Sequence, residues 1–360
     1  MRMRYSALSL CTLLAFSVGA RSEPRGAAAT SGYEKLRAIK AEAPATKDSK
    51  ATQFLGADDK GHLFLMRGDS LEVFRLGADG RFDRRVGKLA CSGGSSDPVY
   101  AAAMDPGGST WAVGSAFEMA LCDFGKEQRP TGLDWVISSV TFSRSGPLVA
   151  VAAMGPTPDA AEARYKMTVP RVFALEDDRW QPTVWGPIPE VKEGAPTNVM
   201  TAIKAQTDSL ICAGPKDAVW LASWNRYRLQ EVSASKKAGR AIDVGSGDVE
   251  WQKPETTGHV VPRGVVRALV CGREIYLVVS TADGLALDRF EPAQNVLERV
   301  LLDGVTVSSS GPMTAALAGN ELWLGGRFAA DGLWRISLDD LTAAHWKPVK
   351  DVRIDGKPPS

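Results

Sequence analysis

The sequence predicts an all-β fold, a single-domain β-propeller of six to seven blades. Six times, an apolar segment of about five residues runs into a short turn rich in Gly, Asp or Asn and then into a second apolar segment, the pattern of a β-hairpin. The copies recur at intervals of roughly 50 residues, close to the length of a four-stranded propeller blade. Because one such sheet cannot bury its own face, this repetition favours a ring of stacked blades.

Each predicted hairpin consists of two segments. These are 53–57 with 62–65, 100–104 with 110–113, 138–142 with 147–150, 201–205 with 209–212, 267–271 with 274–277, and 314–318 with 321–324. A third strand is predicted after five of the copies, beginning at Leu71, Met119, Pro170, Leu285 and Gly332. A seventh blade would form if residues 345–356 paired with residues 33–50 and so closed the ring.

The first twenty residues have the pattern of a secretory signal peptide. Arg2 and Arg4 precede an apolar run, which ends in the small residues Val18, Gly19 and Ala20. We expect cleavage after Ala20 and a mature chain that is periplasmic or extracellular.

The mature chain is predicted to have two parts. Residues 21–49 form an N-terminal linker, in which the near-helical spacing of Tyr33, Leu36 and Ile39 predicts a short helix over 33–42. Residues 50–360 form the propeller domain.

Charge and hydropathy limit the partners that we expect. The chain has 43 Lys and Arg against 42 Asp and Glu, and its longest basic run is Lys236-Lys237, so nucleic acid is not expected. No stretch after the signal peptide approaches the roughly 18 to 20 uninterrupted apolar residues of a membrane span. The expected partner is an envelope protein, a glycan or a small polar ligand, and the expected state is a monomer.

Four cysteines remain after signal-peptide cleavage, and an oxidising compartment would permit two disulfides among them. Four cysteines allow three pairings. We favour Cys91 with Cys122 and Cys212 with Cys271, because these pairs join neighbouring repeats. The alternative is that Cys212 and Cys271, which have apolar neighbours, are reduced core residues.

Two segments resemble a known class of repeat. DPGGSTWAVG (105–114) and GNELWLGGRFAADGLWRISLDD (319–340) are similar to the Asp-x-x-Gly-x-Leu-Trp-x-Gly pattern of bacterial propellers, as found in two-component-regulator sensor propellers and in NHL or lactonase-like propellers. The resemblance implies a propeller scaffold over most of residues 50–349. It carries no catalytic residue to this chain.

The opening residue of each predicted first strand is able to form hydrogen bonds. These residues are Gln53, Tyr100, Ser138, Thr201, Arg267 and Thr314. Because the first strands of a propeller line its central channel, they would form a polar rim at one channel mouth. We predict that Tyr100, Thr201, Arg267 and Thr314 bind a polar or anionic small ligand, or a side chain of a partner, at this rim. The alternative is that the rim contacts only water.

Ten tryptophans are present, and two groups of them predict different roles. Trp111 and Trp323 lie in second strands, which favours packing between blades. Trp180 and Trp185 follow no repeat and are candidates for exposed ligand-binding aromatics. They would make the chain a carbohydrate-binding surface protein.

Catalytic groups are sparse in the sequence. His62, His259 and His345 are far apart and lack the spacing of metal ligands, and no Gly-x-Ser-x-Gly motif occurs. We therefore predict no catalytic residue and no metal ligand, and the sequence identifies no cofactor. The leading hypothesis is an exported, non-catalytic binding or scaffold propeller of the bacterial envelope. The alternative is a propeller enzyme, either a lactonase-like hydrolase or a quinone-dependent dehydrogenase.

Overall fold

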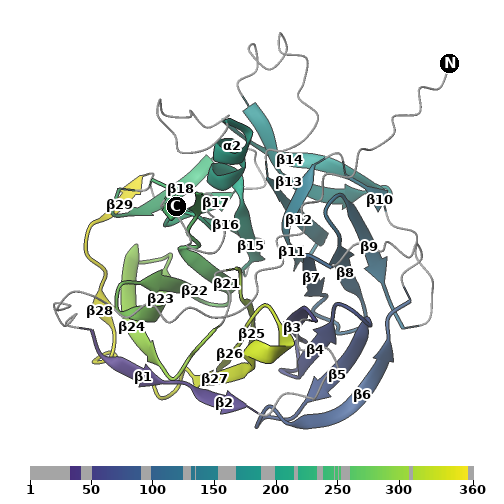
Figure 1. The fold of residues 1–360 in the computed structure, drawn as a ribbon, viewed down its shortest axis with the longest axis horizontal. Coiled ribbons are helices and arrows are strands. Elements are labelled where there is room, and N and C mark those ends of the chain that lie inside the picture. Colours follow the sequence, from purple (N-terminus) through teal and green to yellow (C-terminus); the bar gives the residue numbers. More distant parts are fainter. Residues whose placement is uncertain are drawn as a thin grey trace.

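The computed structural model describes most of the chain after the N-terminal segment. The described residues are 33–41, 51–90, 99–124, 131–133, 135–152, 168–187, 199–214, 218–232, 238–246, 248–249, 251–252, 260–307 and 311–355. Six of their sheets are arranged radially around a centre, which is a six-bladed β-propeller (Figure 1). Neighbouring strands are antiparallel throughout the blades except where the N-terminal β1 joins β24 in parallel. The predicted fold class is confirmed.

Blades 1 to 5 each have four strands of their own, numbered outward from the centre of the ring. Blade 1 contains β3 (Gln53–Ala57), β4 (Leu63–Arg67), β5 (Glu72–Leu76) and β6 (Phe82–Lys88). Blade 2 contains β7 (Ala101–Met104), β8 (Trp111–Gly114), β9 (Glu118–Cys122) and β10 (Thr131–Gly132). Blade 3 contains β11 (Val136–Ser143), β12 (Gly146–Ala152), β13 (Thr168–Glu176) and β14 (Arg179–Pro187).

The second half of the ring follows the same plan. Blade 4 contains β15 (Ser209–Ala213), β16 (Val219–Ser223), β17 (Arg228–Val232) and β18 (Ala238–Val244). Blade 5 contains β21 (Val266–Cys271), β22 (Ile275–Thr281), β23 (Gly284–Glu291) and β24 (Val296–Asp303). Blade 6 contains β25 (Thr314–Ala318), β26 (Glu321–Gly325) and β27 (Leu333–Ser337), and its fourth strand comes from the N-terminal segment. A small hairpin of β19 (Trp251–Gln252) and β20 (Val261–Pro262) lies between blades 4 and 5 in the sequence.

The terminal segments close the ring by adding outer strands to existing blades. The N-terminal strands β1 (Lys35–Arg37) and β2 (Ile39–Ala41) pair with β24 of blade 5 and β27 of blade 6. The C-terminal strands β28 (Lys347–Pro348) and β29 (Val352–Asp355) pair with β24 and with β18 of blade 4. In Figure 1 the purple N-terminal strands lie beside the green and yellow strands of blades 5 and 6.

Two predictions about these segments are therefore wrong. The described residues 33–41 do not form the predicted helix, because Leu36 and Ile39 lie on two short strands separated at Ala38. Among the described residues the terminal segments also form no seventh blade, because they pair with strands of blades 4, 5 and 6 and not with each other. The 21–49 linker thus includes residues that belong to the propeller.

The fourth repeat differs from the prediction. Residues 201–205, predicted as an innermost strand, lie in the helix α2 (Val199–Thr207). The innermost strand of blade 4 is β15, which was predicted as the second strand. A five-residue apolar window does not separate helical from strand periodicity, and here Ala202 and Ala205 form the buried face of a helix.

Packing between blades supplies the core. Six clusters of buried apolar side chains fill the six gaps between neighbouring blades. Trp111 lies between blades 1 and 2 and Trp323 between blades 6 and 1, and their exposed fractions are 0% and 2%. The predicted packing role of these two tryptophans is confirmed.

A disulfide joins Cys212 at the inner edge of blade 4 to Cys271 at the inner edge of blade 5, with a Cα–Cα distance of 5.5 Å. This confirms one of the two favoured pairings and excludes the reduced state that was the alternative. Cys91 lies outside the described residues, so the Cys91–Cys122 pairing stays a prediction.

Candidate functional site

A channel runs through the centre of the ring and is lined by all six innermost strands. Its cavity volume is about 360 Å³. The lining extends from Thr52, Tyr100 and Arg327, where the innermost strands begin, to Pro106 and Ala213 at the opposite end. Most lining side chains are small, as close approach of the blades near the axis requires. We call the end at which the innermost strands begin the upper mouth.

Arg327 places a positive charge at the upper mouth. Its guanidinium carbon lies 6.0 Å from the centroid of the Tyr100 ring and 5.8 Å from that of Phe328, within the range of cation–π attraction. Burial lowers the pKa of Arg327, and Tyr100 offsets this in part. Within the described part of the chain Arg327 forms no ion pair. An arginine remains protonated at neutral pH, so the mouth holds a cation without a carboxylate partner.

Arg327 is held in place by the loop that carries it. This loop, residues 326–332, joins the second and third strands of blade 6 and contains the 3₁₀ helix η2 (Ala329–Asp331). Asp331 packs across Gly326, where an added Cβ would lie only 2.0 Å from the Asp331 Cβ. The Asp331 carboxylate also accepts a hydrogen bond of 3.1 Å from the Phe328 backbone N–H. The loop is therefore braced from within.

Gln53 of blade 1 anchors the same loop from the other side of the ring closure. Its side-chain Nε2 donates to the carbonyl oxygens of Gly326, Phe328 and Gly332 at 3.0, 3.1 and 3.2 Å. Its backbone N–H donates to the carbonyl of Arg327 at 3.1 Å. Gln53 is only 1% exposed, so these bonds form in a buried setting where they are worth most.

The predicted polar rim is only partly available to a ligand. Arg267 is 6% exposed and donates from Nε to the Gly311 carbonyl at 2.8 Å, and burial lowers its pKa to about 10. The Thr314 hydroxyl accepts a 2.7 Å bond from the Leu55 backbone N–H. Tyr100 is 44% exposed and lines the channel. Of the predicted ligand-binding residues at the rim, Tyr100 is thus the one presented most openly to solvent.

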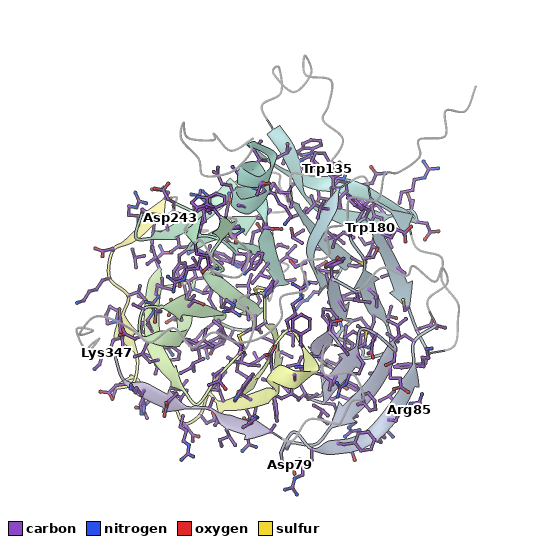
Figure 2. All side chains as sticks on the ribbon, in the orientation of Figure 1. Asp79, Arg85, Trp135, Trp180, Asp243 and Lys347 are labelled. Atoms are coloured by element: carbon purple, nitrogen blue, oxygen red, sulfur yellow. A yellow bond between two sulfur atoms is a disulfide. The ribbon has the colours of Figure 1, made fainter. Side chains whose placement is uncertain are left out.

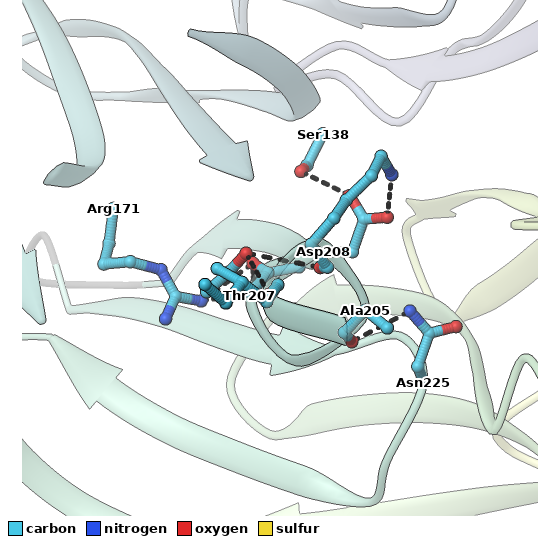
Figure 3. A network of polar contacts seen from close by, with 9 residues as sticks. Ser138, Arg171, Ala205, Thr207, Asp208 and Asn225 are labelled. Carbon is cyan, nitrogen blue, oxygen red and sulfur yellow. Dashed lines mark hydrogen bonds and ion pairs between the residues drawn. The ribbon is translucent and has the colours of Figure 1, made fainter. Parts of the chain in front are cut away.

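Thr201 does not lie where the sequence placed it. It belongs to α2 and not to an innermost strand, so the reason for assigning it to the rim was wrong. Asp208, which directly follows α2, accepts hydrogen bonds from Lys204 and, at 2.8 Å, from Ser138, which lines the channel. Figure 3 shows this network between blades 3 and 4.

Further contacts in this network fix α2 against the two blades. Arg171 of β13 donates to the Thr207 carbonyl at 2.8 Å and to the Ser209 hydroxyl at 2.9 Å. Asn225 donates to the Ala205 carbonyl at 2.9 Å. Burial is the main reason that the pKa of Arg171 falls to about 10. These polar groups bind one another, and so the network holds the blades together at this seam.

The two candidate surface tryptophans lie on the outermost strand of blade 3. Trp185 is 49% exposed, whereas Trp180 is half-buried against the apolar cluster between blades 2 and 3 (Figure 2). Trp180 is therefore less accessible than the sequence suggested. The role of either residue in binding stays a prediction.

The histidines and acids form no recognisable metal centre in the described chain. His62 Nδ1 lies 2.8 Å from Asp58 Oδ2 within one turn, and His345 contacts Thr342. His259 lies outside the described residues. Among the described residues, no group of three or more His, Cys, Asp or Glu side chains is arranged to hold a metal. Nor does any helix there have the length and apolar character of a membrane span.

Arg327 was missed by the sequence reasoning. It follows two glycines in the loop after the second strand of the last repeat, a place where propeller loops converge on the channel. The segment Gly325-Gly326-Arg327-Phe328 lies within the repeat 319–340, whose pattern indicated only a propeller scaffold. The sequence signal that could have identified Arg327 is its position between two glycines and an aromatic residue, in a loop that follows a second strand.

No family model matches the chain, and no curated protein matches it. Similar folds occur in virginiamycin B lyase from Staphylococcus aureus, with a TM-score of 0.48 and 12% identity over 84% of this chain and 98% of that one. The PQQ-bound aldose sugar dehydrogenase from Streptomyces coelicolor has a TM-score of 0.47 and 12% identity over 88% of this chain and 98% of that one. At these identities and TM-scores, neither comparison indicates an activity for this chain.

Proposed function

We propose that this protein binds a small anionic molecule at the upper mouth of its channel. The observation that carries the proposal is Arg327, a partly desolvated guanidinium that lines the channel between Tyr100 and Phe328 without a carboxylate partner in the described chain. A cation in a low-dielectric funnel concentrates anions from solution. The braced loop holds the guanidinium ready, so binding requires little reorganisation.

Binding, and not catalysis, is the role that these groups favour. The lining of the channel contains no carboxylate or imidazole among the described residues, and these are the usual general acids and bases. The lactonase-like and quinone-dependent alternatives remain hypotheses without a supporting residue at the mouth. A scaffold role in the bacterial envelope stays compatible with a bound ligand.

Export from the cytoplasm is part of the proposal. The Cys212–Cys271 disulfide is typical of proteins in oxidising compartments, and the first twenty residues have the pattern of a signal peptide. We infer a periplasmic or extracellular protein that meets its ligand outside the cytoplasm.

Thermal unfolding with acetate and with acetamide, its neutral isostere, tests the anion site. A ligand that binds only the native state raises the midpoint of unfolding by mass action. We expect acetate to raise the Tm of the wild-type protein and acetamide to leave it unchanged. Arg327→Gln should abolish the acetate effect.

Arg226→Gln is the matched control, because Arg226 is also half-buried in a loop between second and third strands but does not line the channel. This variant should keep the acetate response. An equal Tm shift in all three proteins would show a general salt effect, and no shift in any of them would also contradict the proposal.

A further inference from the structure

The charges of the channel lining limit the charge of its ligand. Arg327 is the one charged side chain among the described residues that line the channel. A ligand with one negative charge would therefore neutralise the site. A second negative charge would lie against low-dielectric walls without a partner, which is costly. A planar carboxylate also matches the fork of donors on a guanidinium.

The main-chain edges of the innermost strands limit the chemistry of the rest of the ligand. Strands β3, β7, β11, β15, β21 and β25 each stand at the end of their sheet, so one edge of each has no strand partner within its blade. On β3 the N–H groups of Gln53 and Leu55 are already bonded to Arg327 and Thr314, so a ligand would use the remaining edge groups. Such an edge presents both N–H donors and C=O acceptors. The small side chains around them, such as Ala102 and Ala315, leave these groups within reach.

A hydroxyl group both donates and accepts, and so it can replace the water that solvates such an edge. An alkyl chain would remove that water and offer no hydrogen bond in return, which leaves polar groups unsatisfied. The cavity of about 360 Å³ is near the lower end of the range for small-molecule sites. The channel thus favours a short body with many hydroxyls.

We propose that the ligand is a small polyhydroxylated monocarboxylate, a sugar acid, whose carboxylate binds Arg327 and whose hydroxyls bind the main-chain edges of the innermost strands. This inference rests on the proposed function, since it names the class of anion bound at the same site. It adds two requirements that the proposed function lacks: a single charge and a hydroxylated body.

Isothermal titration with four six-carbon probes separates these requirements. Gluconate has one carboxylate and five hydroxyls, hexanoate has the same charge without hydroxyls, sorbitol has hydroxyls without charge, and glucarate has two carboxylates. We expect gluconate to bind at least about tenfold more tightly than hexanoate or sorbitol, because each comparison removes hydrogen bonds or the ion pair. Glucarate should bind no more tightly than gluconate, apart from the factor of about two given by its two ends.

Variants assign the binding to Arg327. Arg327→Gln should lose gluconate binding, and Arg226→Gln should keep it. Arg327→Lys, which retains the charge but not the planar fork, should bind gluconate with intermediate affinity. If Arg327→Gln destabilises the fold, Arg327→Lys tests the role of the guanidinium in its place.

The outcomes distinguish the two proposals. Hexanoate that binds as tightly as gluconate, through Arg327, would overturn the sugar-acid inference and leave the anion site intact. Glucarate that binds much more tightly than gluconate would overturn the single-charge requirement. If no anion shows binding that depends on Arg327, both the inference and the proposed function fail.

Discussion

Blades 1 to 3 and blades 4 to 6 share one four-stranded plan but are held differently at their outer edges. Strands β6, β10 and β14 end the sheets of blades 1 to 3 with open edges in the described chain. In blades 4 and 5 the fourth strand is covered by strands from the termini, β29 on blade 4 and β1 with β28 on blade 5, and in blade 6 the N-terminal strand β2 supplies the fourth strand. The termini therefore close the ring by adding strands to one half of it, blades 4 to 6, which we call the reinforced half.

Blades 4 and 5 are also linked by a disulfide, and blade 5 contains a buried ion pair. The Cys212–Cys271 disulfide joins blades 4 and 5 near the axis. Within blade 5, the fully buried Asp288 accepts bidentate hydrogen bonds from Arg299 at 2.7 and 2.8 Å, and Tyr227 of blade 4 donates a further bond to it. Burial raises the pKa of Asp288, which the bonds from Arg299 and Tyr227 oppose. Blade 1 has a solvent-exposed ion pair between Arg75 and Asp83.

The candidate site lies where these halves meet. Arg327 comes from blade 6, Gln53 from blade 1 and Tyr100 from the strand entry of blade 2. A ligand on Arg327 would contact groups from both halves. We therefore expect ligand binding to stabilise the closure between blades 6 and 1 above all.

The largest expected effect comes from the buried ion pair. Arg299→Met leaves Asp288 buried without its cation and should lower the free energy of unfolding by about 3 to 5 kcal/mol. Arg75→Met removes a solvent-exposed pair of blade 1 and should cost under about 1 kcal/mol. Urea unfolding followed by circular dichroism measures both. Similar losses in the two variants would show that the halves do not differ in this respect.

Removal of the disulfide should have the next largest effect. The double variant Cys212→Ala/Cys271→Ala should lower the free energy of unfolding by about 2 to 4 kcal/mol, since the bond closes a loop that spans most of blade 4. Chemical unfolding under non-reducing conditions measures the loss. A change below about 0.5 kcal/mol, within ordinary surface-mutation effects, would remove the disulfide from the reasons for the difference between the halves.

The smallest expected effect comes from the C-terminal strand. Ending the chain after Lys350 removes β29 and exposes part of the cluster that Val352 and Ile354 cover. Partial burial of two aliphatic side chains predicts a loss of about 1 to 2 kcal/mol. Hydrogen exchange should show that protection falls first along β18. Unchanged protection of β18 would mean that β29 does not reinforce this edge.

The blades themselves could be predicted from the sequence because second strands are apolar on both faces. In β4 and β8 every residue is buried, which produces short apolar runs that are easily recognised. The edge strands could not be predicted in this way. The segment Val352–Asp355 alternates between half-buried and exposed residues and includes two charges, so it has no apolar run. Its strand structure depends on the edge of β18 that it meets.

The candidate site was predicted only in part, for a related reason. Four of the six rim residues lie on innermost strands and Tyr100 directly precedes one, and both Tyr100 and Thr314 line the channel. Which of these groups bind one another depends on contacts between residues far apart in the chain, as Ser138 with Asp208 illustrates. Arg327 can be recognised as a candidate only in the structure, because a sequence does not show which arginines pair with a carboxylate.

A crystal structure of the protein with gluconate tests the central claim most directly. The account predicts a carboxylate within hydrogen-bonding distance of the Arg327 guanidinium, between Tyr100 and Phe328, and hydroxyls along the innermost strand edges. Gluconate bound elsewhere, for example beside Trp185, or a channel that contains only water under saturating ligand, would contradict it.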